Sequence, residues 1–227
     1  MKKIKLKKIH FIIFSIIIII IILAAIFIPK LFSNKKEQYY KSENLVIYNY
    51  YKFNKEKDNI WYLQLSIKNT PYIIPFYYNP YEAESVYIDN NTFYEFKRFL
   101  DLKKPKIIYI SVDPLASSKV AVSVFEIKRI LGKDYNIFNF DVLYGIHYLH
   151  EDNFTNFPVA TCNEAREDRI IIILNTSNEN NQVINKSNFI LTKNHCIIMN
   201  AVNETELIRV SDALAYYLLG IFPLKQQ

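Results

Sequence analysis

The sequence Lys-Ile-Ile-Tyr-Ile-Ser-Val-Asp at residues 106–113 has the nearly continuous apolar run of a strand that is buried on both faces of a sheet. Over residues 118–131, apolar residues recur at intervals of three or four, as on one face of a helix, and Gly132 stands where a left-handed helix cap is common. Residues 136–142 are expected to form the next strand. Strand, helix and strand in this order predict a right-handed parallel crossover.

Upstream of the crossover, three runs rich in aromatic and β-branched residues are separated by polar turns. In the middle run Trp61, Leu63 and Leu65 occupy alternate positions, which predicts one buried face. The pattern indicates an antiparallel three-strand meander. Its expected strands cover residues 46–53, 60–67 and 72–78, and its turns cover residues 54–59 and 68–70.

Two further helices have recognisable start signals. Thr92 and Glu95 have the spacing of a capping box before a short helix that reaches residue 102. Asn203 and Glu206 form a similar pair before the final helix, which Gly220 is expected to end. Strands are also expected at residues 169–174 and 195–200, with a polar hairpin at residues 182–191. The fold class is therefore α/β or α+β, in which the meander precedes a mixed sheet with two or three packed helices.

Residues 9–28 carry no charge and include seven consecutive isoleucines. Twenty residues at about 1.5 Å each span about 30 Å, the thickness of a hydrocarbon core, whereas the apolar region of a cleavable signal has only about 7–15 residues. We therefore expect a retained transmembrane helix in contact with the lipid bilayer. Five lysines precede it and three follow, so the charge bias predicts a cytoplasmic N-terminus and a C-terminal domain outside, at the cell membrane.

The basic character of the chain comes from its N-terminal end. The whole chain has 28 Lys plus Arg against 22 Asp plus Glu, and residues 1–36 hold eight lysines and no acid, so the remainder has 20 against 22, a net charge of −2. This remainder has no positive field for phosphate backbones, which excludes nucleic acid as a partner. The predicted organisation is a basic tail, an anchor, a linker, a meander with a short helix, and an α/β ectodomain, at residues 1–8, 9–28, 29–44, 45–104 and 105–222.

An extracytoplasmic location bears on the cysteines and asparagines. Cys162 and Cys196 are the two cysteines of the chain, and in an oxidising compartment a disulfide is favoured over two buried thiols. Five N-x-S/T triplets, a mild excess over chance, all follow the apolar segment, so N-glycosylation competes with the plainer interpretation of asparagine in surface turns. The glycosylation candidates are Asn90, Asn153, Asn175 and Asn185, whereas Asn203 is better explained as a helix cap.

Asp113 ends the strand at residues 106–113, and Ser117 and Ser118 stand at the start of the next helix. Open α/β sheets bind ligands at this edge, so these three residues are the candidate ligand-binding site, with Asp113 as its general base or ion ligand. The loop has no glycine that would let a phosphate approach. A structural Asx turn and helix cap is the plainer interpretation.

Two histidines, His147 and His150, lie beside Glu151 and Asp152, and these residue types bind zinc or similar ions. The spacing matches no metal motif, and a solvated loop is the alternative. His195 beside Cys196 resembles a base beside a nucleophile, but adjacent residues of a strand point to opposite faces. No cofactor is implied, and neither a serine-hydrolase elbow nor a zincin motif is present in the sequence.

Several segments carry a resemblance to known proteins. They are Pro71-Tyr-Ile-Ile-Pro-Phe-Tyr-Tyr-Asn-Pro, Ile107-Ile-Tyr-Ile-Ser-Val-Asp-Pro, Pro158-Val-Ala-Thr-Cys, and Cys196-Ile-Ile through Leu207-Ile-Arg-Val-Ser-Asp-Ala-Leu to Leu218-Leu-Gly-Ile. With these segments the chain resembles uncharacterised single-pass membrane-anchored proteins of small-genome archaea. The resemblance implies an ectodomain with paired cysteines on an N-terminal anchor, and it implies no biochemical activity.

These observations favour a non-enzymatic ectodomain that binds a protein partner at the cell surface or assists envelope assembly. This expectation rests on the lack of a catalytic motif in an anchored domain with paired cysteines. It predicts an exposed apolar patch for partner docking. The alternative is an extracytoplasmic enzyme or small-ligand-binding domain with its site at the end of the 106–113 strand.

Overall fold

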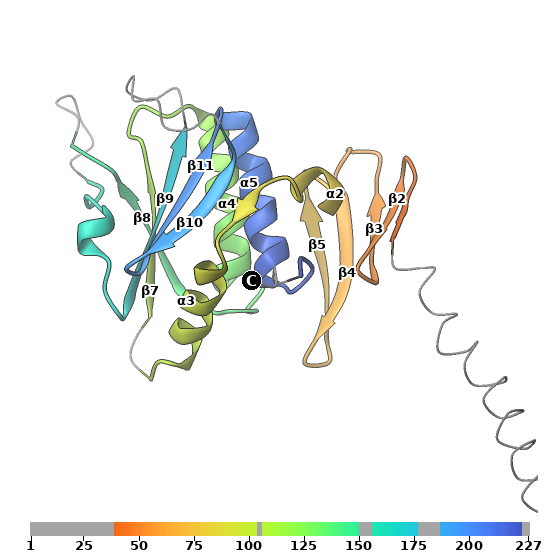
Figure 1. Cartoon of the computed structure of the whole chain (residues 1–227), viewed down its shortest axis with the longest axis horizontal. Helices are drawn as coiled ribbons and strands as arrows, with labels where there is room; N and C mark the ends of the chain where they lie inside the picture. The colour runs from red at the N-terminus through yellow and green to blue at the C-terminus, as the bar shows by residue number, and fades with distance from the viewer. Residues whose placement is uncertain (1–38, 104–105, 150–155, 177–186, 224–227) are drawn as a thin grey trace, which may run out of the picture.

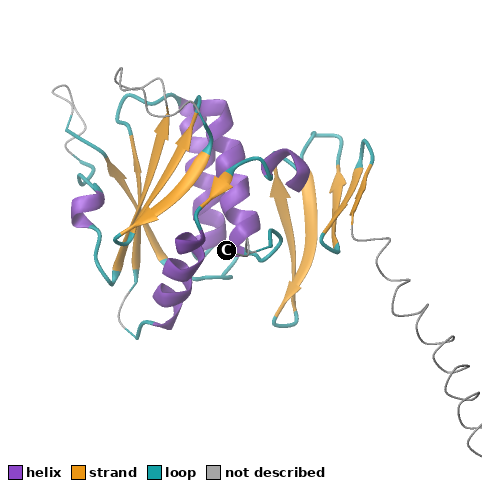
Figure 2. Cartoon of the chain, in the orientation of Figure 1, coloured by secondary structure: helices purple, strands orange, loops and turns teal. Residues whose placement is uncertain are grey.

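The computed structural model describes residues 39–103, 106–149, 156–176 and 187–223, which form two sheets with helices between them (Figure 1). Sheet A is antiparallel, with the strand order β1-β2-β3-β4-β5, and sheet B is mixed, with the order β6-β10-β11-β9-β7-β8. Figure 2 shows α4 and α5 between the two sheets. The fold is mixed α and β, as predicted. Residues 9–28, the predicted anchor, lie outside the described residues, and within the described residues no helix has the length and apolar character to cross a membrane.

The bounds of the elements are as follows. Sheet A contains β1 (Tyr39–Lys41), β2 (Leu45–Tyr48), β3 (Tyr51–Lys55), β4 (Trp61–Ile67) and β5 (Thr70–Phe76). Sheet B contains β6 (Tyr87–Ile88), β7 (Ile107–Val112), β8 (Asp141–Ile146), β9 (Arg169–Thr176), β10 (Phe189–Lys193) and β11 (Cys196–Ala201). The helices are α2 (Pro80–Ala83), α3 (Asn90–Asp101), α4 (Ser118–Leu131) and α5 (Glu204–Leu218), and η1 (Cys162–Glu164) is a single 3₁₀ turn.

The predicted three-strand meander is a sheet of five strands. The first predicted strand is interrupted at Asn49 and Tyr50, whose φ angles of 48° and 69° form a two-residue turn between β2 and β3. Both residues take the left-handed conformation that such hairpin turns require. Tyr39–Lys41, within the predicted linker, form β1 and pair with β2. The alternation of β4 is confirmed at Trp61 and Leu63, which are buried, whereas Leu65 and Ile67 of the same face are half-buried.

The predicted parallel crossover is confirmed, because β7 and β8 are parallel neighbours joined by α4. The second strand begins at Asp141 and not at residue 136. Asn136 and Asn139 have positive φ angles of 54° and 57°, which keep this segment out of the sheet. Gly132 has a φ of −83° and is not a left-handed cap. A Cβ there would lie 2.7 Å from the Lys128 carbonyl oxygen, so close approach of the backbone explains the glycine.

The start of α3 differs from the prediction. The N-cap is Asp89, whose carboxylate accepts the Asn91 N–H, and Thr92 lies inside the helix. Thr92 is buried, and its hydroxyl lies 2.8 Å from that of Thr192 on β10. Because β6 pairs with β10, this helix belongs to sheet B and not to the meander unit predicted for residues 45–104.

The final helix matches its prediction at both ends. The Asn203 side chain accepts the Glu206 N–H, and Gly220, with a φ of 73°, follows the last turn. The Ile221 N–H donates to the Tyr216 carbonyl and the Gly220 N–H to that of Tyr217, which is a Schellman ending. Residues 210–217 are all buried, so the helix is enclosed on every side.

One continuous apolar core joins the two sheets through α4 and α5. The Tyr216 ring on α5 is fully buried, with its centroid 5.6 Å from that of Phe53 and 4.3 Å from that of Phe76 on sheet A. On the opposite face of the same helix, Leu207 and Val210 belong to the core that also contains the inner face of sheet B. The helices therefore hold the carboxyl ends of the parallel strands in a fixed position.

Candidate functional site

The carboxyl ends of β7, β9 and β11 meet the N-termini of α4 and α5, and this edge carries the predicted ligand-binding residues. Asp113, which follows β7, is 7% exposed. Its Oδ1 accepts the Leu115 N–H at 2.6 Å and the Tyr148 hydroxyl at 2.9 Å, and its carbonyl accepts the Ala116 N–H at 3.1 Å. Asp113 therefore forms the local turn of the plainer interpretation, and it also fixes Tyr148 from the loop after β8.

Ser117 is the N-cap of α4, and Ser118 is the first residue of that helix. The Ser117 hydroxyl accepts the Lys119 N–H at 3.3 Å. Glu204, at the start of α5, accepts the Ser117 N–H at 2.9 Å and also the Ser117 hydroxyl. These hydrogen bonds lower the pKa of Glu204. A carboxylate of the chain thus occupies the place where the N-terminus of α4 would accept an anion.

An apolar recess of about 380 Å³ lies on one side of Asp113, between α4 and the edge strand β8. We name it the α4–β8 groove. Its walls include three exposed aromatic residues, Phe125, Tyr144 and Phe157, which are 60%, 37% and 46% exposed. Smaller apolar residues that also line it are Ile110, Val112, Ala121, Val124 and Ile146. Asp113, Ser117 and Ser118 line the same recess, so the three predicted residues lie together.

A polar cavity of about 600 Å³ lies on the other side of Asp113. We name it the strand-end cavity. It is lined chiefly by Asp113, Lys119, Tyr148, Thr176, Asn203 and Glu204. The sequence analysis missed Tyr148, Thr176 and Glu204 as members of a site. Thr176 ends β9 as Asp113 follows β7, so the strand-end rule that selected Asp113 would also have selected Thr176.

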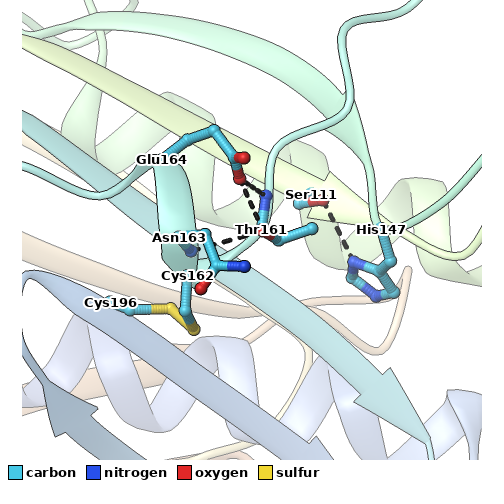
Figure 3. Close-up of a disulfide and its surroundings, with 7 residues drawn as sticks. All are labelled: Ser111, His147, Thr161, Cys162, Asn163, Glu164 and Cys196. Atoms are coloured by element: carbon cyan, nitrogen blue, oxygen red, sulfur yellow. Dashed lines mark hydrogen bonds between the residues drawn. A yellow bond between two sulfur atoms is a disulfide. The ribbon is translucent and has the colours of Figure 1, made fainter.

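His147, one of the two candidate metal ligands, has both ring nitrogens engaged, and Figure 3 shows the contact of one of them with Ser111. Nδ1 lies 3.0 Å from the hydroxyl of the fully buried Ser111, and Nε2 lies 2.9 Å from the Leu174 carbonyl. Since a carbonyl only accepts, Nε2 carries the proton and Ser111 donates to Nδ1. Burial lowers the pKa of His147. His150 lies outside the described residues, within which no three His, Cys, Asp or Glu side chains are grouped to hold a metal ion.

Cys162 and Cys196 form the predicted disulfide, which ties η1 to β11 on the outer face of sheet B (Figure 3). The η1 turn has its own capping box, in which the Glu164 carboxylate accepts the Thr161 N–H at 2.7 Å. Ala160 and Cys196 pack with Ile171 in a small second core. The disulfide therefore holds η1 and the residues just before it against this face of sheet B.

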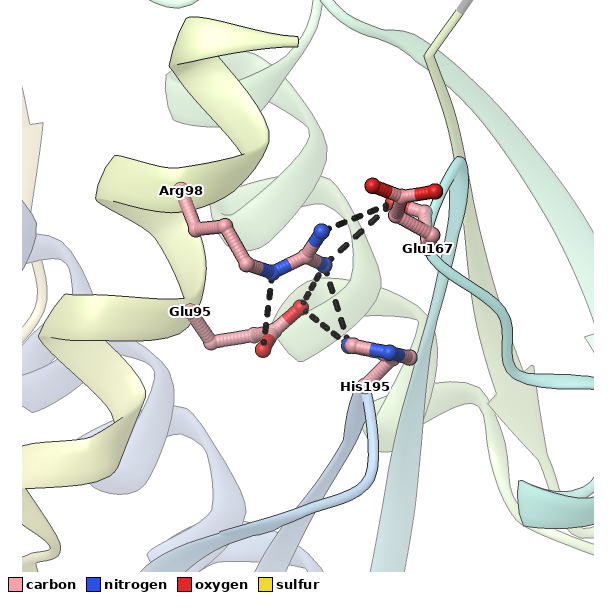
Figure 4. Close-up of polar contacts among 4 residues, drawn as sticks. All are labelled: Glu95, Arg98, Glu167 and His195. Carbon is pink, nitrogen blue, oxygen red and sulfur yellow. Dashed lines mark hydrogen bonds and ion pairs between the residues drawn. The ribbon is translucent and has the colours of Figure 1, made fainter.

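His195 does not act on Cys196, because it faces α3 (Figure 4). Its Nδ1 lies 2.9 Å from a Glu95 carboxylate oxygen and 3.0 Å from Arg98 Nη2. Arg98 also donates to the Glu167 carbonyl. The cluster ties α3 to the turns before β9 and β11. We interpret it as a structural ion network.

The glycosylation candidates lie in different environments. Asn90 is the first residue of α3 and is partly buried. Asn175 lies within β9, and its amide nitrogen donates to Asn200 Oδ1 at 3.3 Å. Asn153 and Asn185 lie outside the described residues.

Comparisons with known proteins give no further guide to this site. No family model, no curated protein and no solved structure matches the chain. The resemblance to archaeal membrane-anchored proteins stays a prediction. Function must therefore be inferred from the two cavities and the strand edge beside them.

Proposed function

We propose that this protein is a membrane-anchored, non-enzymatic interaction module, held outside the cytoplasm by residues 9–28. In this proposal its folded domain binds an extended segment of a partner protein along the edge of β8, with side chains of that segment in the α4–β8 groove. The apolar anchor segment and the Cys162–Cys196 bridge support the location. The edge of β8 carries the proposal for binding.

The backbone of β8 has one side on β7 and one side open. The Asp141 N–H donates to the Lys106 carbonyl and the His147 N–H to the Val112 carbonyl, so odd-numbered residues of β8 face β7. In a parallel pair the alternate residues face away, which are Val142, Tyr144 and Ile146. In the part of the chain that the structure describes, Val142 and Tyr144 have no backbone partner on this open side. They present donors and acceptors for another strand.

The same edge already pairs with a short parallel segment of this chain. The Ile146 N–H donates to the Pro158 carbonyl at 3.1 Å, and Ile146 accepts the Ala160 N–H at 2.9 Å. Val159 forms an isolated parallel bridge with Ile146. This edge therefore has geometry suited to strand addition. Within the described residues, its pairing with residues 158–160 involves Ile146 and does not extend to Tyr144.

The α4–β8 groove supplies the side-chain contacts that strand addition needs for affinity. Main-chain hydrogen bonds alone are not selective, and pockets for alternate side chains give specificity. Tyr144 on β8 and Phe125 on α4 both line this groove. An apolar recess beside an open strand edge fits an extended segment with apolar residues at alternate positions.

Peptide selection on the full-length chain in detergent tests the proposal. We expect a displayed library of random decapeptides to yield sequences with alternating apolar residues and no internal proline, with dissociation constants on the order of micromolar. Phe125→Ala should weaken their binding by at least about fivefold, because it removes an apolar wall. Tyr94→Ala is the matched control, since Tyr94 is a similarly exposed aromatic residue, 62% against 60%, on α3. Equal loss in both variants, or in neither, would contradict the proposal.

A further inference from the structure

The strand-end cavity differs in chemistry from the α4–β8 groove and is not used by the proposed function. Its lining contains the carboxylates of Asp113, Glu204 and Glu206 and the ammonium group of Lys119. The formal charge of these four groups is −2, and the ion pair of Arg209 with Glu206, at 3.2 Å, reduces the local charge to −1. Three strand ends and two helix starts converge on it, which is where α/β sheets bind small ligands.

The helix N-termini beside this cavity do not call for an anion. Glu204 already accepts the Ser117 N–H at the start of α4, and Asn203 accepts the Glu206 N–H at 2.9 Å at the start of α5. At each of these helix starts, a side chain of the chain therefore already accepts a backbone N–H that could otherwise bind an anion.

Two buried side chains that line the cavity have open acceptor positions. Thr176 is 3% exposed, and within the described residues its hydroxyl has no hydrogen-bond partner. Asp113 is 7% exposed, and both of its side-chain hydrogen bonds use Oδ1, so its Oδ2 has no hydrogen-bond partner among the described residues. Among the described residues Asp113 forms no ion pair. The positive charge of Lys119 lowers the pKa of Glu204 instead. A buried carboxylate without a counter-ion is costly unless a cation joins it.

We propose that the strand-end cavity binds an alkylammonium group, with Asp113 Oδ2 and Thr176 Oγ1 as acceptors. An ammonium group brings three donors and one positive charge, which match these two oxygens and the negative lining. A metal ion fits less well, because the described residues contain no group of three carboxylate, histidine or cysteine ligands. The ammonium group belongs either to a free amine or to the side chain of a lysine in a polypeptide.

Saturation-transfer NMR on the full-length chain tests the site with three probes. They are n-butylammonium, its neutral counterpart n-butanol, and Nα-acetyl-lysine amide. We expect saturable binding of n-butylammonium with a dissociation constant on the order of millimolar, and binding of n-butanol at least about tenfold weaker. Tighter binding of Nα-acetyl-lysine amide by about tenfold assigns the ammonium group to a lysine side chain, and equal binding assigns it to a free amine.

Three variants separate the site from general attraction to acidic surfaces. Asp113→Asn keeps the acceptor Oδ1 for the turn but removes the charge, and it should weaken n-butylammonium binding by about tenfold or more. Thr176→Val removes the second acceptor with little change of shape and should also weaken it. Asp134→Asn, at an exposed carboxylate beyond the end of α4, should leave binding unchanged. Equal binding of n-butanol and n-butylammonium, or unchanged binding by Asp113→Asn, would overturn the proposal.

Discussion

Asp212, a fully buried carboxyl group on α5, accepts the backbone N–H of Tyr78 at 2.8 Å, at the point where the chain leaves sheet A. The same Oδ2 accepts the Tyr77 N–H at 2.9 Å. Arg129 of α4 donates to the Pro75 carbonyl just before it. Polar side chains of the two central helices thus fix the exit of β5 and with it the position of sheet A.

Asp212→Ala should destabilise the protein by about 2–4 kcal/mol. The substitution leaves two partly buried backbone N–H groups without their acceptor. Asp212→Asn retains an acceptor oxygen and should cost less. Urea unfolding followed by Trp61 fluorescence measures both free energies of unfolding, since Trp61 is buried in sheet A. Equal small losses in the free energy of unfolding of both variants would show that the position of sheet A does not depend on the Asp212 side chain.

Glu126 of α4 makes stability depend on pH. Burial raises the pKa of Glu126 to about 7, although the positive charge of Arg129 opposes this shift. Burial also raises the pKa of Asp212, and the negative charge of Glu126 raises it further. In the folded state the pKa of Glu126 exceeds its ordinary value of 4.5, so between pH 4.5 and 7 the folded state binds more protons than the unfolded state. The protonated Glu126 therefore contributes to the free energy of unfolding at low pH, and this contribution is lost as the pH rises through that window. This contribution to the free energy of unfolding is about 3 kcal/mol.

The variant Glu126→Gln tests this assignment. Its free energy of unfolding, minus that of the parent, should rise between pH 4.5 and 7 and stay constant above, because the variant lacks the group whose ionisation destabilises the fold. Glu43→Gln, at an exposed carboxylate, is the control. A parallel pH dependence in parent and Glu126→Gln would contradict the assignment.

His147, which Ser111 contacts, changes stability with pH in the direction opposite to Glu126. Burial lowers the pKa of His147 below its ordinary 6.5, so the unfolded chain takes up the proton first, and stability is lost as pH falls below 6.5. His147→Gln should flatten this loss between pH 7 and 5. At pH 7.5, Ser111→Ala should cost about 1–2 kcal/mol because it leaves Nδ1 without a donor, whereas Ser66→Ala, at an exposed site, should cost little. A steeper acid transition in His147→Gln would refute the interpretation.

The disulfide gives a combined test of stability and location. It closes a loop with a sequence separation of 34, for which the chain-entropy model gives roughly 3–4 kcal/mol. Reduction, or replacement of both cysteines by alanine, should lower the free energy of unfolding by about that amount. In protein isolated from its native membrane, peptide mapping should find Cys162 bridged to Cys196, and Asn175 unmodified because its amide lies in the sheet. Fully reduced cysteines in that preparation would contradict the extracytoplasmic location.

The parallel crossover and both long helices could be predicted because their signals are local. An apolar run of six residues and a stripe of period 3.6 specify β7 and α4 without reference to the rest of the chain. The Cys162–Cys196 bridge was predictable for a similar reason, since an even pair has one intramolecular partner arrangement.

The turns were harder to predict because the chain has three glycines. Two-residue hairpins commonly use glycine where φ is positive, but here Asn49 and Tyr50, and also Asn194 and His195, take that conformation. Asparagine tolerates it, yet its frequency in this chain hides the turns among ordinary polar residues. The break between β2 and β3 was missed for this reason.

The candidate site was predictable only in part. Asp113, Ser117 and Ser118 follow a buried strand, and a positional rule finds them. Tyr148 and Glu204 reach the same place from positions 35 and 91 residues away, counting from Asp113, and no local pattern marks them. The open edge of β8 depends on the strand order of sheet B, which pairing between distant segments decides.

Amide-resolved hydrogen exchange of the full-length chain, with and without a selected peptide, tests the edge of β8 most directly. We predict new protection at the Val142 and Tyr144 amides, because these point outward, and little change at Leu143 and Gly145, because these already face β7. Protection confined to other parts of the chain, with Val142 and Tyr144 exchanging as before, would contradict strand addition as the mode of binding.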